Sequence, residues 1–233
     1  MTALVAAGET SVSGVFSYLT TAANWTGTQG LPHRLVQHLG YSVETLALAA
    51  VIALPLGLFT GHTGRGGSVI SLLANASRAL PTLGLLTIFA IVIGVGLEAA
   101  VIPLVVLAVP SILVNTHVGV RGVDPSLVDA ARGMGLTGRQ VLWRVEFPVA
   151  LPLVVLGLRT AALQVVSTAT IAAYVGLGGL GRYIIDGQAT HNFAELAAGA
   201  LVVAVFAIVT EAVFLLGQRL LVSPGIRQGR RPA

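Results

Sequence analysis

The chain has 233 residues, of which 55% are hydrophobic and 9% are charged, and its mean hydropathy is +0.89. This composition excludes an ordinary soluble domain and predicts one polytopic membrane domain. The absence of cysteine excludes disulfides, thiolate catalysis and cysteine metal sites. All 13 basic side chains are arginine. In a membrane protein they indicate topology, so we expect membrane lipid as a partner and no nucleic acid.

Residues 1–40 form a segment that we expect outside the cytoplasm or in the membrane interface. It has no basic stretch and no clean cleavage site, so we do not expect it to be removed as a signal peptide. A helical face followed by Trp25 is typical of an interfacial helix, although a frayed polar tail is an open alternative. The stretch 27–32 is predicted to break the chain before the first span. The apolar residues of the helical face are Val12, Val15, Phe16 and Leu19.

Five apolar stretches define an all-α membrane domain over residues 41–221, which precedes a basic tail at residues 222–233. Most arginines fall in loops on one side of these stretches, and Arg34 and Arg182 fall on the other. The positive-inside rule therefore predicts an N-terminus outside and a C-terminus in the cytoplasm. The predicted spans are residues 41–60, 80–96, 99–116, 149–173 and 194–216.

A polar, basic loop at residues 120–148 separates the third and fourth spans. Asp124 followed by Pro125 is a typical helix start, and Gly135 can end that helix in the left-handed conformation. A second short helix is expected to open at Thr137 or Gly138. Such a pair suits insertion into a cleft of another protein, and a solvated loop is the plainer alternative. The first helix has an apolar face made of Leu127, Ala130, Ala131 and Met134.

The same loop resembles the EAA loop of ABC importer permeases. The pattern is an acidic residue, two alanines, a glycine four residues after the second alanine, and a branched-x-apolar-proline ending, here 145–148. Asp129 departs from the usual glutamate. The resemblance implies a type I ABC importer fold and a coupling helix that docks into a cytoplasmic ATPase subunit. The coupling residues that it implies are Asp129, Ala130, Ala131, Gly135, Arg139 and Pro148.

Arg159 lies about three helical turns into the fourth span, where a charge needs a partner or water. Two interpretations stay open. Arg159 can form a structural ion pair, for which Glu211 is a candidate partner, or it can lie beside a translocation path. The glycine-rich segment 176–181 is not a nucleotide loop, since no strand precedes it. We expect these glycines to form a sharp re-entrant turn at the outer surface. The residues assigned to the path or its gate are Pro81, Arg159, Tyr174, Gly178 and Gly179.

The segments around 78–86, 157–161 and 168–188 look like the permeases of osmoprotectant importers, and the likeness covers roughly residues 39–221. It implies a cargo of glycine betaine, choline, carnitine or a related quaternary amine. It also implies a second permease, identical or paralogous, and an extracytoplasmic binding protein. ATP and Mg²⁺ would lie on the ATPase, since the chain has no lysine to complete a Walker A motif, and no metal or catalytic residue is expected here.

Some alternatives remain open at this stage. An importer for methionine or another amino acid would share the coupling loop, so cargo is not fixed by it. A stand-alone secondary transporter would require relay carboxylates in mid-span and internal repeats, and a membrane scaffold would leave the loop unexplained. The expected location is a bacterial cell membrane, which the chain crosses several times. Residues that bind the substrate are not assigned.

Overall fold

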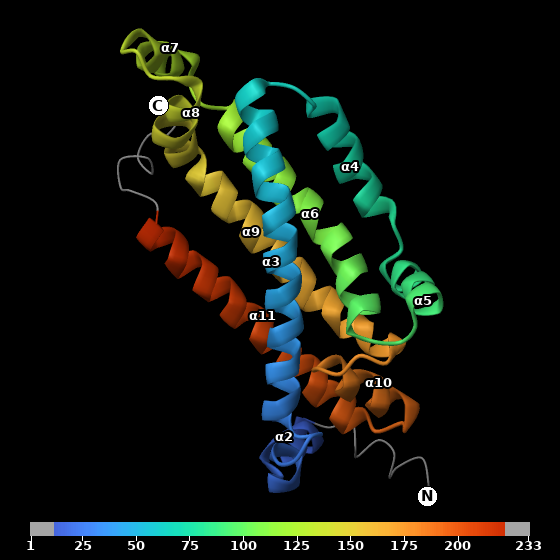
Figure 1. The fold of residues 1–233 in the computed structure, drawn as a ribbon. Helices are drawn as coiled ribbons and strands as arrows, with labels where there is room; N and C mark the ends of the chain where they lie inside the picture. The colour runs from blue at the N-terminus through green and yellow to red at the C-terminus, as the bar shows by residue number, and fades with distance from the viewer. Residues whose placement is uncertain (1–11, 222–233) are drawn as a thin grey trace, which may run out of the picture. The chain divides into compact units, whose positions relative to one another are not determined.

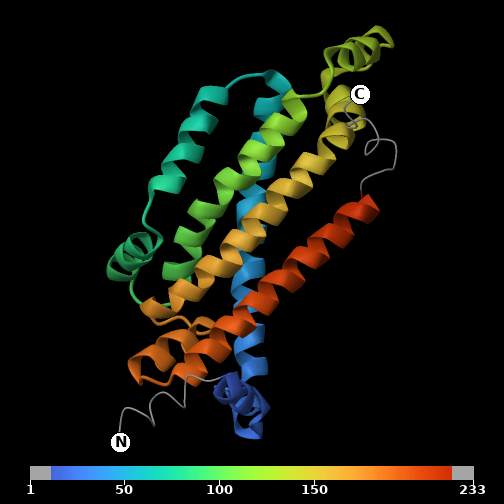
Figure 2. The same ribbon diagram turned by 180° about the vertical axis from the view of Figure 1, so that it is seen from behind.

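The computed structural model describes residues 12–221, without the side chain of Arg78, and this range consists of helices and the turns between them. Figures 1 and 2 show the helices from opposite sides. The all-α class predicted from the sequence is therefore confirmed. In chain order the elements are α2 (Val12–Thr20), η1 (Ala22–Trp25), α3 (Leu31–Thr63), α4 (Gly67–Ala79), α5 (Thr82–Ile93), α6 (Leu97–Arg121), α7 (Pro125–Gly133), α8 (Gly138–Val141), η2 (Leu142–Glu146), α9 (Phe147–Ile171), η3 (Ala172–Val175), α10 (Gly181–Ala189) and α11 (Phe193–Leu221).

Four helical runs within residues 12–221 are long and apolar enough to cross a membrane. They are α3, α6, α11 and the run Gly138–Val175, which contains α9. These runs correspond to the predicted first, third, fifth and fourth spans. α6 is one continuous helix through Pro103 and Pro110.

The helix that contains the predicted first span starts earlier than that span. α3 begins at Leu31, whereas the apolar pattern placed the start of the span at Tyr41 and a break at residues 27–32. Pro32 explains the difference. The N–H groups of the first turn of a helix have no partner within the helix, so a proline, which lacks an N–H, is tolerated there. The proline therefore lies inside the start of the helix instead of separating the helix from what precedes it.

The predicted second span is also different. α5 has 12 residues, which gives a length of about 18 Å at ~1.5 Å per residue, against a hydrocarbon core of about 30 Å. α4 ends one residue before Leu80, which is extended (φ −73°, ψ 124°) because Pro81 follows it. A fifth span thus exists when α4 and α5 are counted together as one broken span.

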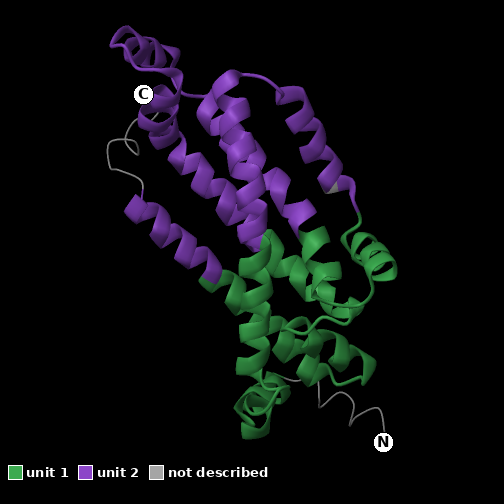
Figure 3. Cartoon of the chain, in the orientation of Figure 1, with its two compact units in different colours: residues 1–45, 81–104, 164–209 green, residues 46–80, 105–163, 210–233 purple. Residues whose placement is uncertain are grey.

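The chain divides into two compact units, which Figure 3 distinguishes by colour. Unit 1 contains residues up to 45 together with 81–104 and 164–209. Unit 2 contains residues 46–80 and 105–163, and residues from 210 onward. The loop that resembles the EAA loop lies in unit 2, and the glycine-rich segment lies in unit 1.

In unit 2, small residues bring neighbouring helices close together. A Cβ atom added to Gly61 of α3 would lie 2.7 Å from the Cβ of Val120 in α6. One added to Gly157 of α9 would lie 2.8 Å from the Cβ of Asn115 in α6. Membrane helices commonly associate through such small residues, since close packing replaces the hydrophobic effect as the attraction between them. The buried apolar cluster beside these contacts consists of Leu58, Val120, Ala150 and Val154.

In unit 1, the glycine-rich segment folds against α3. Gly176 and Gly179 have φ values of 85° and 84°, and Gly179 donates its N–H to Oε1 of Gln37 at 3.1 Å. The expected sharp turn is present and its backbone is satisfied by protein, while its place at the outer surface stays a prediction.

The amino-terminal part of unit 1 contains the predicted helix, α2. Val12 and Phe16 are 87% and 69% exposed on it, whereas Leu19 packs against the cluster of Leu31 and Tyr183. The placement of this helix in the membrane interface stays a prediction.

Candidate functional site

The first helix of the coupling loop, α7, starts where the sequence predicts. The Asp124 carboxylate accepts a hydrogen bond from the backbone N–H of Ser126 at 2.8 Å, and Pro125 occupies the first helical position. This bond satisfies one of the N–H groups that a helix start leaves without a partner. It also holds the pKa of the Asp124 carboxylate below its ordinary value.

α7 ends in a Schellman motif at Gly135. The residue has a φ of 84°, as predicted. The N–H of Leu136 donates to the carbonyl of Ala131 at 3.2 Å, and the N–H of Gly135 donates to the carbonyl of Arg132 at 2.9 Å. These two bonds satisfy carbonyl groups that the end of the helix would leave unpaired. The turn therefore fixes the direction in which the chain leaves α7.

The second helix, α8, begins with a capping box at Thr137. The N–H of Thr137 donates to Oε1 of Gln140 at 2.8 Å, and the Thr137 side chain completes the box. α8 continues into η2, a wide π-type turn in which the N–H of Phe147 donates to the carbonyl of Leu142. π-type turns occur most often at functional positions. Pro148 follows in the first turn of α9, where a proline is tolerated.

The predicted coupling residues differ in exposure. Asp129, Ala130 and Arg139 are exposed, Pro148 is half-buried, and Ala131 is only 2% exposed. The predicted apolar face is therefore divided, since Ala131 points into the chain itself. Two large apolar residues of that face, Leu127 and Met134, are 48% and 75% exposed. The exposed part of this face consists of Leu127, Ala130 and Met134, and Asp129 beside it is also exposed.

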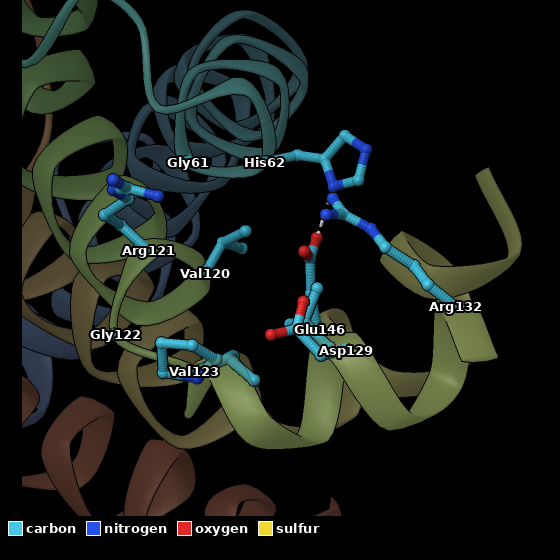
Figure 4. A pocket seen from close by; sticks show the side chains of 11 residues that line it. Gly61, His62, Val120, Arg121, Gly122, Val123, Asp129, Arg132 and Glu146 are labelled. Atoms are coloured by element: carbon cyan, nitrogen blue, oxygen red, sulfur yellow. Dashed lines mark hydrogen bonds and ion pairs between the residues drawn. The ribbon is translucent and has the colours of Figure 1, made fainter. Parts of the chain in front are cut away.

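A cavity of about 480 Å³ lies between the end of α3, the end of α6 and α7 (Figure 4). His62 of α3 and Glu146 of η2 meet at this cavity, with 2.5 Å between Nδ1 and Oε2. Sequence reasoning missed both residues. Glu146 occupies the unspecified position of the motif ending, and His62 follows the predicted first span. The cavity is lined by Gly61, His62, Val120, Arg121, Gly122, Val123, Pro125, Val128, Asp129, Arg132 and Glu146.

Arg159, in unit 2, pairs with Glu211 of α11. The Arg159 Nε donates to Oε2 of Glu211 at 2.7 Å, and Nη2 donates to Oε1 of the same carboxylate. The candidate partner named from the sequence is thus confirmed. Each side chain keeps about a quarter of its surface exposed, 26% for Arg159 and 27% for Glu211. The place of Arg159 beside a translocation path stays a prediction.

The other predicted path residues all lie in unit 1. Tyr174 is 55% exposed and donates its hydroxyl to Oε1 of Gln188 at 3.2 Å. Gly178 and Gly179 lie in the turn that contacts α3, and Pro81 is exposed at the start of α5. α5 packs against η3, so the segment after Pro81 and the segment of Tyr174 are neighbours. Their assignment to a path or gate stays a prediction.

Comparisons with known proteins show which family this chain resembles. The family described as "Binding-protein-dependent transport system inner membrane component" matches residues 53–227. The choline transport permease OpuBB of Bacillus subtilis is 32% identical, over 85% of this chain and 91% of its own. The glycine betaine/carnitine/choline permease OpuCB of the same organism is 31% identical, over 84% and 91%. The carnitine permease OpuCB of Listeria monocytogenes is 34% identical, over 78% and 83%.

Solved structures show the same fold. An inward-facing structure of the methionine ABC transporter MetNI has a TM-score of 0.71, with 23% identity over 81% of this chain and 94% of that chain. The resemblance seen in the loop, the type I importer fold and the multi-pass location in a bacterial plasma membrane are therefore confirmed. The chain belongs to the family of inner membrane components of binding-protein-dependent transport systems.

Proposed function

We propose that this chain is the permease subunit of an ATP-driven importer for a small quaternary amine, such as glycine betaine, choline or carnitine. Relatives that carry these cargoes in their names match 78–85% of it, at 31–34% identity. The cargo proposal rests on these relatives, because the coupling loop is common to importers of many solutes.

The observation that carries the permease role is the geometry of the coupling segment, residues 124–148. Its two short helices are held by a cap, a Schellman motif and a capping box, so their mutual angle is set by local hydrogen bonds. Leu127 and Met134 are exposed apolar side chains on it. An apolar surface on a polar segment outside the spans is best explained by a protein partner. We take this partner to be the ATPase subunit.

This surface separates the role of the ATPase subunit from the role of this chain. ATP and Mg²⁺ bind to the partner ATPase, and this chain performs no hydrolysis itself. Closure of the ATPase pair moves the coupling segment, which is continuous with α9 through η2 and with α6 through residues 122–124. A second permease completes the passage, and an extracytoplasmic binding protein delivers the cargo. With the coupling segment in the cytoplasm, the N-terminus lies outside.

Reconstituted transport tests the proposal. The permease is inserted into liposomes with its ATPase and binding protein, and uptake of labelled choline, glycine betaine, carnitine and methionine is measured with ATP inside. Uptake of at least one quaternary amine is expected, and none is expected with an ATPase whose Walker A lysine is replaced. Uptake of methionine alone would overturn the cargo, and uptake without ATP hydrolysis would overturn the importer class.

A further inference from the structure

The His62–Glu146 pair connects parts of the chain that no short peptide link joins. α6 leads directly into the coupling segment, and η2 leads directly out of it into α9. α3 has neither connection, since α4 and α5 intervene between it and α6. Any force that the coupling segment exerts on α3 must therefore pass through noncovalent contacts.

Two kinds of noncovalent contact join α3 to η2 and α9, and a separate hydrogen bond joins Thr60 of α3 to His117 of α6. The apolar residue Leu58 of α3 packs in the cluster with Val120, Ala150 and Val154, which belong to α6 and α9. Such apolar packing is nondirectional, so it resists separation more than sliding. The second kind is the bond from His62 to Glu146, whose short length and specific atoms fix one register of the two elements.

Burial makes the pair hard to replace by solvent. Glu146 is only 5% exposed, and a buried carboxylate without a partner carries a large desolvation cost. Its neighbour in the chain, Phe147, closes the π-type turn with its N–H on Leu142, so Glu146 is held where that turn ends. In Figure 4 the two side chains point toward each other at the edge of the cavity between α3 and α7. The pair lies across this cavity from the close contact of Gly61 with Val120, so it is a separate link between α3 and η2.

We infer that His62 and Glu146 are positioning residues for coupling, which make the cytoplasmic end of α3 move together with the coupling segment when the ATPase partner closes. This inference rests on the proposed function. Breaking the pair should leave α6 and α9 connected to the segment through the chain, while α3 loses its register to it. Transport would then become less efficient for each ATP hydrolysed.

The first experiment measures this relation directly and needs no cargo. The chain has no cysteine, so spin labels can be attached at Arg65→Cys, just after α3, and at Arg144→Cys, an exposed position in η2 outside the apolar surface of α7. The distance between the labels is measured in the assembled complex with and without ATP. With the native pair, the distance is expected to stay the same in both states. With Glu146→Gln or His62→Gln, addition of ATP is expected to change or broaden it.

The second experiment measures the number of cargo molecules transported for each ATP hydrolysed in proteoliposomes. This ratio does not depend on how much complex assembles. Each single variant is expected to lower it by up to about tenfold, because a charge-assisted hydrogen bond is replaced by a weaker neutral one. The double variant His62→Gln/Glu146→Gln should be no worse than the single variants, and the exchange His62→Glu/Glu146→His should recover most of the ratio.

A matched control distinguishes this role from general stabilisation of α3. His117 of α6 contacts Thr60 of α3 through Nδ1 and Oγ1 at 3.1 Å, and this contact does not involve the coupling segment. His117→Gln should therefore retain the label distance and the ratio. The inference is overturned if the label distance in Glu146→Gln responds to ATP as in the native chain. Equal losses in His117→Gln would also overturn it. A native complex that transports no quaternary amine refutes the cargo alone, because the label distances still test the pair.

Discussion

Removing Glu211 should destabilise the permease more than removing both members of its ion pair. The guanidinium of Arg159 donates two hydrogen bonds to this carboxylate within the membrane-spanning helices α9 and α11. Glu211→Leu leaves the arginine charged, with about a quarter of its side chain exposed to its surroundings. Breaking a buried pair costs about 3 to 5 kcal/mol, and a charge at mid-span about 2.5 to 3.5 kcal/mol on insertion scales. Because the pair is incompletely buried, we expect a loss of about 2 to 4 kcal/mol.

The double variant is the informative comparison. Arg159→Met together with Glu211→Leu removes both charges and keeps an apolar side chain of similar length at each position, so its free energy of unfolding should lie within about 1 kcal/mol of the native value. Reversible unfolding of the purified permease in mixed micelles measures both variants. Glu98→Ala, at an exposed site at the start of α6, is the matched control. A single variant as stable as the native protein would refute the argument that the pair neutralises an otherwise costly charge.

Further variants test the local geometry of the chain. Gly135→Val forces a β-branched residue to a φ of 84° and should reduce receptor-stimulated ATP hydrolysis while the protein still inserts, as assayed in proteoliposomes. Gly181→Ala places a Cβ against the carbonyl of Thr170 and should lower the melting temperature, whereas Gly40→Ala, with open space around it, should not. The lowered pKa of Asp124 means that its cap stabilises α7 above about pH 4 and is lost as the pH falls further. Hydrogen exchange of residues 125–133 should show this loss, and Asp124→Asn should abolish the pH dependence.

The coupling segment could be predicted because the interactions that shape it are local. Its cap joins residues two positions apart, its Schellman bonds join residues three and five apart, and its capping box joins residues three apart. Residue types such as Asp before Pro, or Gly at a helix end, report these interactions directly. The exception is Ala131, whose burial depends on how α7 packs against α8 and η2. Local rules place a residue on a helical face but do not say what covers that face.

Long-range pairings were accessible only in part. Glu211 could be named as a partner for Arg159 because a charge in a span requires compensation, and carboxylates are scarce in this chain. His62 gave no comparable signal, since a histidine at the end of a span is commonly solvated. The start of the second span at Leu80 was predicted, but the short length of α5 was missed, because hydropathy measures the apolar content of a stretch and not how far its helix continues. Each missed feature depends on backbone conformation or on a partner distant in sequence.

The aromatic residues of unit 1 bear on where cargo is selected. Tyr18 and Tyr183 meet edge to face, with 6.3 Å between ring centroids and 77° between planes. Tyr183 is 6% exposed and donates its hydroxyl to the carbonyl of Gln29 at 2.6 Å. Burial raises the pKa of both phenols, so they act as neutral packing and hydrogen-bonding groups. A quaternary ammonium is bound by several open ring faces around one cation. Here the ring of Tyr183 is buried and its contact with Tyr18 is edge to face, so the two rings pack against each other within the apolar cluster of unit 1. This pair therefore does not form an aromatic cage, and the proposed importer would not select a quaternary amine on it.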